Sequence, residues 1–364
     1  MSNKKRTLCV DCNYLLKQSH HGNNRFEEKY GHVGAVDTFL AITRKMIKEQ
    51  DITKVILFWD GLNAGKMRYR IYPYYKSNRH KSWFDDDIIL TSADIRKIEW
   101  LNKQKDEEAI LLVQKIRIQQ YAEELFFRQY EFPEIESDDA IAFYCKNIKE
   151  EDEEVIIYTN DQDFLQLLNI DNVFIYLSNK KDLINKYNFN ILYFNYHYSN
   201  TGLIKAIEGC KSDVIHGVDG VGEKTLLKYF PELKDRPVTF DEIYNKAKEI
   251  NKKRKKPLKA LENLIEGKTS VNVDSVLNGE HLFKLNYKLV NLLEPMITDE
   301  AIEVLETQTL SPLDIEDRGG KNIIRLMFED GLINRIPNGS DGYKDFLIPF
   351  LPVVNSEKNY TKSF

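Results

Sequence analysis

The sequence contains little cysteine and no long apolar run. Four of its 364 residues are cysteines, and only Cys9 and Cys12 lie close together, so neither a disulfide framework nor a zinc site is expected. A redox pair at these two positions is disfavoured because both lie along an apparent strand. No stretch of about 18 uninterrupted apolar residues occurs, and the N-terminal residues lack the apolar segment of a signal peptide. We therefore expect a cytoplasmic protein with no membrane partner.

The sequence also lacks an excess of basic residues. Its formal net charge is −5, which argues against the uniformly basic surface of many nucleic-acid-binding proteins. A local basic patch stays compatible with this value, because a cluster of buried acids would itself lower the total. With 42% hydrophobic and 30% charged residues, the composition is typical of a soluble globular protein with material for one large domain or two.

Three apolar segments are each followed at once by an aspartate. They are typical of buried strands that end near Asp11, Asp60 and Asp161. A helical pattern over about residues 34–47 and a further apolar segment at 173–177 give strands alternating with helices, which predicts an α/β fold with a mainly parallel sheet. In such sheets ligands bind beyond the carboxyl ends of the strands. The three aspartates are therefore expected to converge at one edge.

A second group of acids lies at Glu136, Asp138 and Asp139, where a helix is expected to begin. The spacing of three places Glu136 and Asp139 on one helical face, with Asp138 beside them. Acids concentrated in this way repel one another unless a cation joins them. Oxygen ligands suit Mg²⁺ or Mn²⁺ and not zinc. The sequence predicts a magnesium site, although a single strand-terminal aspartate is more commonly a helix N-cap or a turn residue.

Basic and aromatic side chains alternate over residues 67–84. Cations neutralise phosphates and ring faces accept unstacked bases, so this segment suits a nucleic-acid strand. The alternative is a solvated loop with some aromatic side chains in the core. The acidic residues 85–87 that follow would repel DNA, so any basic surface is local. Residues 91–128 carry a long helical pattern, whose first part is expected to project as a flap and whose second part is expected to pack on the sheet.

A glycine-rich loop follows the predicted sheet. Gly217, Gly220 and Gly222 permit tight backbone turns just before an apparent helix, and Lys224 adds a positive charge. We interpret this loop as a DNA-binding hairpin, with an ordinary turn as the alternative. The basic run at residues 252–256 is more typical of a solvated surface than of a second backbone contact.

Taken together, these motifs resemble the 5′-nuclease family, which comprises flap endonucleases and the 5′→3′ exonuclease domains of bacterial polymerases. The matching segments are Val10-Asp11, Phe58-Trp-Asp-Gly61, Tyr74-Tyr-Lys-Ser-Asn-Arg79, Glu136-Ser-Asp-Asp139, Thr159-Asn-Asp-Gln-Asp163, and Ser212-Asp213 followed by Gly217-Val-Asp-Gly-Val-Gly222. They follow the family's order over about residues 7–230. The C-terminal part, including residues 283–292, is most similar to the T-even phage ribonuclease H branch.

The resemblance implies a fold and a division of the chain. Residues 1–200 would form a PIN-like α/β catalytic domain with a mainly parallel central sheet and a helical arch at about residues 72–107. Residues 201–364 would form an α-helical DNA-binding domain with a helix–three-turn–helix element at about residues 203–230, which in the family often binds K⁺.

The resemblance also implies roles for individual residues. One Mg²⁺ would be held by Asp11, Asp60, Glu136 and Asp138 or Asp139, and a second by Asp161, Asp163 and Asp213. Lys76 and Arg79 match basic residues that contact the scissile phosphate and stabilise the charge that builds on it. The residues expected to bind DNA are Tyr75, Lys76, Arg79, Gly217, Gly220, Gly222, Lys224 and Thr225.

One position departs from the family pattern. Cys210 stands three residues before Asp213, where the family usually has an aspartate. A neutral thiol is a poor Mg²⁺ ligand and a thiolate favours softer metals, so the second ion is expected to bind weakly or through water, or Mn²⁺ to be preferred. The alternative is that a neighbouring acid such as Glu208 substitutes.

The function implied is metal-dependent hydrolysis of phosphodiesters at 5′ ends or flaps of DNA, or of RNA primers, in replication or repair. The expected partners are branched or nicked duplex DNA with a 5′ single strand, an RNA–DNA hybrid, and a replication clamp or single-strand-binding protein. A monomer in the cytoplasm of a bacterium or a phage-infected host is expected. The alternatives are a structure-specific DNA-binding protein with weak catalysis and a PIN-type ribonuclease, which the glycine hairpin disfavours.

Overall fold

The computed structural model describes most of the chain. The described residues are 5–27, 31–78, 92–192, 194–271, 273–277, 279–336 and 342–362. Within these ranges, no helix is both long enough and apolar enough to cross a membrane.

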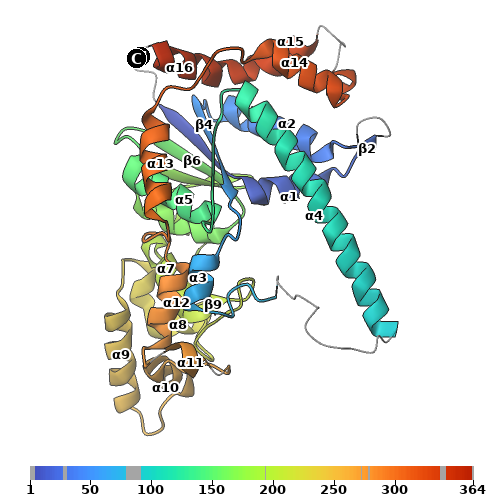
Figure 1. Cartoon of the computed structure of the whole chain (residues 1–364). Coiled ribbons are helices and arrows are strands. Elements are labelled where there is room, and N and C mark those ends of the chain that lie inside the picture. The colour runs from blue at the N-terminus through green and yellow to red at the C-terminus, as the bar shows by residue number, and fades with distance from the viewer. Residues whose placement is uncertain are drawn as a thin grey trace.

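A six-stranded sheet forms the centre of the N-terminal half of the chain (Figure 1). Its strands, in spatial order, are β5 (Arg128–Phe132), β4 (Lys54–Asp60), β1 (Arg6–Asp11), β6 (Glu154–Thr159), β7 (Val173–Leu177) and β8 (Asp182–Ile184). All neighbouring strands are parallel except the β7–β8 pair, which is antiparallel. The predicted α/β fold with a mainly parallel sheet is therefore confirmed.

Helices cover both faces of the sheet, because alternate strand residues point to opposite sides and both sides are apolar. Leu8 and Val10 pack on one side with helices α1 (Cys12–Gly22) and α2 (Gly34–Glu49). Cys9 packs on the other side with elements that follow β5. These are α5 (Ser137–Phe143), the π-helical turn η1 (Tyr144–Ile148) and the 3₁₀ helix η2 (Gln162–Asn169).

The long helical pattern corresponds to α4 (Ser92–Glu124). Its last turns bury Ile118 and Tyr121 against the sheet side, whereas its first turns extend away from the body of the molecule (Figure 1). The prediction of a helix that projects at one end and packs at the other is confirmed. The predicted helical end at residue 128 is wrong, because Arg128 begins β5. The predicted arch also includes residues 79–91, which lie outside the described part of the chain.

A helical part follows the sheet. Its elements are α6 (Phe189–Leu192), η3 (Tyr198–Asn200), α7 (Thr201–Glu208), β9 (Gly209–Cys210), β10 (Ile215–His216), α8 (Glu223–Tyr229), η4 (Pro231–Lys234), α9 (Phe240–Lys252), α10 (Lys259–Glu266), α11 (Asp274–Leu277), α12 (Leu282–Val290) and α13 (Asp299–Leu310). The remaining elements are β2 (Phe26–Glu27), β3 (Gly31–His32), α3 (Lys66–Ile71), α14 (Gly320–Glu329), η5 (Leu332–Arg335), α15 (Gly342–Leu347), η7 (Ile348–Phe350) and α16 (Leu351–Lys362).

The last helices return to the sheet, where Figure 1 shows them beside α2 and the end of α4. Met327 of α14 and Val353 of α16 are buried in the same core as α1 and α2. Arg128 of β5 forms a buried ion pair with Glu357 of α16, with 2.8 Å between Nη2 and Oε2. Because this packing is apolar and extensive, we propose that residues 320–362 belong with the domain that contains the sheet, and not with the helical domain predicted to run from residue 201 to 364.

Candidate active site

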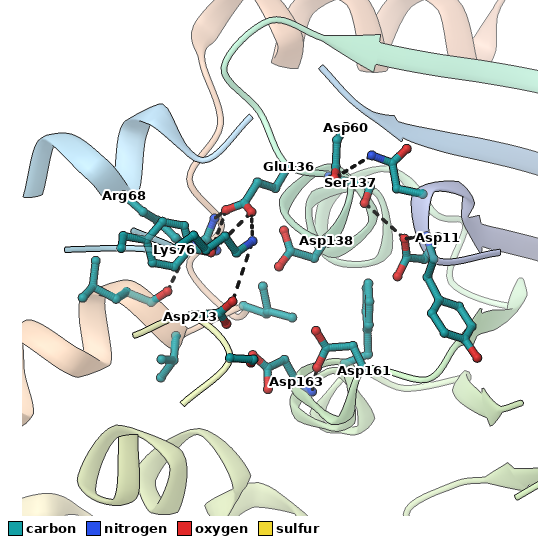
Figure 2. A pocket seen from close by; sticks show the side chains of 18 of the residues that line it. Asp11, Asp60, Arg68, Lys76, Glu136, Ser137, Asp138, Asp161, Asp163 and Asp213 are labelled. Atoms are coloured by element: carbon teal, nitrogen blue, oxygen red, sulfur yellow. Dashed lines mark hydrogen bonds and ion pairs between the residues drawn. The ribbon is translucent and has the colours of Figure 1, made fainter. Parts of the chain in front are cut away.

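The carboxyl ends of β1, β4 and β6 meet at one edge of the sheet. Asp11 ends β1, Asp60 ends β4 and Asp161 follows β6, so the three aspartates converge there as predicted. They line a cavity of about 270 Å³ (Figure 2). The other acids of this cavity are Glu136, Asp138, Asp163 and Asp213.

Neutral donors hold the two aspartates of β1 and β4. Asp11 accepts from the Tyr14 backbone N–H at 3.3 Å and from Thr159 Oγ1 at 3.1 Å. Asp60 accepts from Asn13 Nδ2 at 2.7 Å and from the Ser137 backbone N–H at 2.9 Å. Burial and the adjacent Asp60 charge raise the pKa of Asp11 to about 7, even though the Tyr14 N–H opposes this rise. Neutral hydrogen-bond donors therefore hold both carboxylates in place at the cavity, without a basic side chain.

The start of α5 divides its acids between two directions. Asp138 points into the cavity, where burial raises the pKa of its carboxyl group (Figure 2). Asp139 is almost fully buried and turns toward Arg68 of α3, whose Nη2 donates to Asp139 Oδ1 at 3.0 Å. Asp139 Oδ1 also accepts from the Met296 backbone N–H at 2.8 Å. The pattern of the sequence could not separate these two neighbours.

Glu136 receives three side-chain donors at the rim of the cavity. Arg68 Nη1 lies 2.7 Å from Glu136 Oε2, Tyr75 donates its hydroxyl at 3.0 Å, and the Lys76 ammonium contacts Glu136 Oε1. Burial alone would raise the pKa of Glu136, but Arg68 and Lys76 hold that pKa below its ordinary value. Glu136 therefore stays ionised.

Lys76 connects the two halves of the cavity. Its Nζ contacts Glu136 and lies 4.0 Å from Asp213 Oδ1, and its backbone N–H donates to the Asp213 carbonyl at 2.9 Å. Burial opposes protonation, yet Glu136 and the acids nearby raise the pKa of Lys76 above its ordinary value. The lysine thus keeps its positive charge inside the cavity. Arg79, predicted to act beside it, lies outside the described residues.

The other half of the cavity carries Asp161, Asp163 and Asp213. Asp161 caps η2 by accepting from the Asp163 backbone N–H at 2.9 Å, and Asp163 forms an ion pair with Lys205 of α7. Asp213 Oδ2 accepts from the Cys210 thiol at 3.1 Å. This half therefore already contains positive charge and a thiol among its carboxylates.

Glu208 does not take the place of the missing carboxylate. It is not among the residues that line the cavity. A β-carbon at Gly222 would lie 3.2 Å from Glu208 Oε1, so the carboxyl group lies beside the start of α8. The position of Glu208 therefore does not support the alternative that it supplies the metal ligand missing at Cys210.

The charge balance of the first half fits a divalent cation. Among the residues that the structure describes, none of Asp11, Asp60 and Asp138 forms an ion pair with a basic side chain. Glu136, Asp138 and Asp139 offer oxygen atoms that all lie within 4.8 Å of one another, although Arg68 binds two of these three acids. Clustered oxygen donors of this kind are the ligands of hard divalent cations.

The predicted glycine hairpin lies between α7 and α8, where β9 pairs with β10. Gly217 packs so closely on the preceding backbone that a β-carbon there would lie 2.0 Å from the Glu208 carbonyl oxygen. Gly220 has a φ of 75°, a conformation that favours glycine. Thr225 Oγ1 donates to the Gly220 carbonyl at 3.2 Å, and Lys224 is exposed. The sequence therefore placed the turn correctly, and the role of its residues in DNA binding stays a prediction.

Several residues of the site were not singled out from the sequence. They are Asn13, Arg68, Ser137, Thr159 and Lys205. Arg68 lay within the basic and aromatic segment, but its burial depends on contacts with residues more than 200 positions later, such as the Leu289 carbonyl. No local pattern reports such a contact.

Comparison with known families gives a match over more than half of the chain. Residues 6–194 match the model of the 5′-3′ exonuclease, N-terminal resolvase-like domain. A 5′-3′ exonuclease of Halalkalibacterium halodurans is 27% identical over 287 residues, which cover 78% of this chain and 86% of that protein. DNA polymerase I of Bacillus subtilis is 26% identical over 68% of this chain, but over only 26% of the polymerase.

Solved structures show the same fold. The bacteriophage T5 D15 protein, crystallised with metal ions, superposes with a TM-score of 0.55 at 18% identity, covering 90% of this chain and 99% of that one. The T5 D15 flap endonuclease in a pseudo-enzyme–product complex with DNA and metal ions gives a TM-score of 0.56 at 16% identity, covering 96% and 100%.

Proposed function

Because the chain belongs to the 5′-3′ exonuclease family and is thus a metal-dependent 5′-nuclease, we propose that it hydrolyses DNA at 5′ ends and at the base of 5′ flaps. The observation that carries this proposal is the convergence of seven carboxylates at the carboxyl edge of the sheet, beside a positively charged lysine. The related T5 protein, whose fold this chain shares, is described as a flap endonuclease in complex with DNA. Primers of RNA and RNA–DNA hybrids are the further substrates that we propose to test.

We assign the first Mg²⁺ to Asp11, Asp60, Glu136 and Asp138. The assignment is supported by the cavity, which Asp138 enters while Asp139 is bound by Arg68 and the Met296 N–H. When bound, divalent cations supply the Lewis acidity that activates water and stabilises the leaving oxygen. Asn13, Ser137 and Thr159 orient the carboxylates by hydrogen bonding to Asp11 and Asp60.

A second divalent ion is proposed at Asp161, Asp163 and Asp213, with lower affinity than the first. Two contacts support the lower affinity, since Lys205 pairs with Asp163 and Cys210 donates to Asp213. A cation must displace the ammonium group before it can bind Asp163, and the thiol is a poor ligand for Mg²⁺. Mn²⁺ is expected to substitute more readily in this half.

Lys76 is proposed to bind the scissile phosphate. Its ammonium group lies inside the cavity between Glu136 and Asp213, where the negative charge of a phosphodiester would approach. A fixed positive charge stabilises the additional charge that develops during hydrolysis. Tyr75, whose ring lies 4.9 Å from Lys76 Nζ, supports the same arrangement, and Arg79 is the proposed second cation.

The glycine hairpin is proposed to hold the duplex next to this cavity. Exposed Lys224 would neutralise a phosphate, and the backbone around Gly220 would bind K⁺ through its carbonyl groups. Asn286 of α12 fixes the hairpin by donating to the His216 carbonyl at 2.9 Å. We propose that the duplex lies across the hairpin and the mouth of the cavity, because α12 contacts both: Asn286 holds the hairpin, and Leu289 and Val290 line the cavity.

A panel of labelled substrates tests the proposal. The protein is incubated with Mg²⁺ and a 5′-flap duplex, a nicked duplex, an RNA–DNA hybrid and single-stranded RNA. Cleavage of the flap and the nicked duplex near the 5′ end is expected, and none without a divalent cation. Cleavage confined to single-stranded RNA would identify a ribonuclease, and binding of the flap without cleavage would identify a DNA-binding protein.

A further inference from the structure

Arg68 is a buried cation that joins three separated segments of the chain. Its side chain is 4% exposed, and its Nη atoms form a fork on Asp139, with 3.0 Å between Nη2 and Oδ1. Nη1 also donates to Glu136 Oε2 at 2.7 Å, as Figure 2 shows. Nε donates to the Leu289 carbonyl at 2.8 Å. Each nitrogen of the guanidinium group therefore donates to a protein atom, and burial keeps the group away from a substrate phosphate.

One of these contacts fixes a carboxylate of the cavity. Glu136 lines the cavity and receives Tyr75, Lys76 and Arg68 on its two oxygens. Tyr75 and Lys76 lie in the predicted arch segment of about residues 72–107, whereas Arg68 lies before it on α3 and is the buried residue of that helix. Arg68 is therefore the donor that sets the direction of Glu136 independently of the arch.

The other contacts lead to the helical part. Leu289 lies on α12, and Asn286 on the same helix donates to the carbonyls of Ala206 and His216 at 2.9 Å each. The partner of Arg68, Asp139, is held by the Met296 N–H just after α12. A chain of buried hydrogen bonds thus runs from the glycine hairpin through α12 and Arg68 to Glu136.

We propose that Arg68 is a positioning residue that makes the geometry of the acidic cavity depend on the placement of the helical part. Arg68 touches neither substrate nor cation, and acts through Glu136. This inference rests on the proposed function, because it assumes that Glu136 holds a divalent cation. A substitution that removes the fork of Arg68 is therefore expected to weaken cation binding first, and to leave the cleavage rate at saturating Mg²⁺ largely intact.

The chain offers a matched control in Arg128. Its side chain is 3% exposed and forms a fork on Glu357, with Nε–Oε1 and Nη2–Oε2 distances of 3.1 and 2.8 Å. Like Arg68, it also donates to backbone carbonyls, those of Gln308 and Ser311. Arg128 begins β5, so it lies at the opposite end of the strands from the cavity. Lysine at either position keeps the charge and loses the fork.

The test compares Arg68→Lys with Arg128→Lys. Cleavage of a 5′-flap duplex is measured at saturating DNA across Mg²⁺ concentrations, together with the thermal unfolding midpoint of each protein. Arg68→Lys is expected to raise the half-saturating Mg²⁺ concentration by about tenfold, the usual effect of removing a group that orients a metal ligand, with most of the rate restored at high Mg²⁺. Arg128→Lys is expected to lower the unfolding midpoint without changing the Mg²⁺ dependence. An equal Mg²⁺ dependence in the two variants would overturn the inference.

A second variant covers the case in which Arg68→Lys does not fold. Asp139→Asn keeps Oδ1 for Arg68 and Met296 but removes the charge that holds the fork, and the same increase in half-saturating Mg²⁺ is expected. Asn286→Ala, at a position that does not line the cavity, is expected to raise the half-saturating Mg²⁺ concentration as well, and less than additively with Asp139→Asn because both act on one chain of contacts. Full additivity would contradict the coupling to the helical part.

Asp138→Asn separates failure of this inference from failure of the proposed function. If Asp138→Asn cleaves like the wild type, the proposed cation site is wrong. If Asp138→Asn is inactive while Arg68→Lys and Arg128→Lys share one Mg²⁺ dependence, the cation site stands and only the role of Arg68 is rejected.

Discussion

The Cys210 thiol donates a hydrogen bond to Asp213 Oδ2 across 3.1 Å. This contact fixes one acid of the second half of the cavity without adding a charge to it. The same half holds the Lys205–Asp163 ion pair, whereas the three acids Asp11, Asp60 and Asp138 form no ion pair in the described structure. In the first half, Glu136 pairs with Arg68 and Lys76, but the other three acids have no basic partner in the described part of the chain and would be neutralised by a divalent cation.

Replacing the Cys210 thiol by a carboxylate should strengthen cation binding in the second half of the cavity. Cys210→Asp is expected to lower the Mg²⁺ concentration needed for half-maximal cleavage, because it adds an oxygen ligand and a negative charge beside Asp213. Cys210→Ala serves as the control, since it removes the thiol without adding a ligand. No difference between the two variants would mean that position 210 lies outside the metal site.

The neighbours Asp138 and Asp139 should give different defects. Asp138→Asn is expected to reduce the maximal cleavage rate by about 100-fold or more at any Mg²⁺ concentration, since it removes a ligand of the cation that supplies the catalysis. Asp139→Asn is expected to raise the Mg²⁺ requirement and to recover at high concentration, because it acts through Arg68. Single-turnover rates over a Mg²⁺ series measure both, and the reverse assignment of the two defects would refute our choice of ligand.

Two lysines should separate catalysis from DNA binding. Lys76→Ala is expected to lower the single-turnover rate by about 100-fold with a small change in DNA affinity, because its charge acts on the developing phosphate charge. Lys224→Ala is expected to weaken DNA binding and to reduce the slope of log affinity against log salt by about 1, with little effect on the rate at saturating DNA. If both variants showed the same profile, the division between cavity and hairpin would be wrong.

Lys54, at the start of β4 and at the opposite end of that strand from the cavity, provides a test of how stability depends on pH. Burial lowers the pKa of Lys54 to about 8, although Glu153 opposes this shift and Arg128 adds to it. Because the unfolded lysine keeps its ordinary, higher pKa, the unfolded state binds more protons above pH 8, and the free energy of unfolding rises with pH in that window. Relative to Lys54→Met, the wild type is expected to gain about 2 kcal/mol between pH 8 and pH 9.5.

Urea unfolding at a series of pH values measures this difference. The variant serves as the reference, so contributions from other titrating groups common to both proteins largely cancel. A constant difference between the wild type and Lys54→Met from pH 7 to pH 9.5 would show that Lys54 is not perturbed by burial.

The features that could be predicted from the sequence are those that depend on the order of neighbouring residues. Strands that end in aspartate, a long helix and a glycine turn each follow from the order of neighbouring residues, and their convergence follows from parallel topology. Strand β5 was missed because its residues Arg128–Phe132 follow closely after a helix and begin with a charged residue. Arg128 is buried only in the folded chain, where it pairs with Glu357 and donates to distant backbone carbonyls.

The pairing of side chains within the site could not be predicted from the sequence. Whether Asp138 or Asp139 enters the cavity depends on Arg68 and Met296, which lie 70 positions before and more than 150 positions after the pair. The pairing of Lys205 with Asp163 likewise requires α7 to pack beside η2. The residue types of the site could be predicted from the sequence, whereas their partners could not, because partners are set by tertiary contacts.

The most direct test of the central claim is the Mg²⁺-dependent cleavage of a 5′-flap duplex by Asp60→Asn. The substitution keeps the size of the side chain and the oxygen that accepts from the Ser137 N–H, and removes the charge together with the oxygen that accepts from Asn13. The account predicts DNA affinity close to that of the wild type and a cleavage rate reduced by about 100-fold or more, as for the loss of a group on which metal-ion catalysis depends. Cleavage at the wild-type rate would contradict the assignment of a cation to these carboxylates.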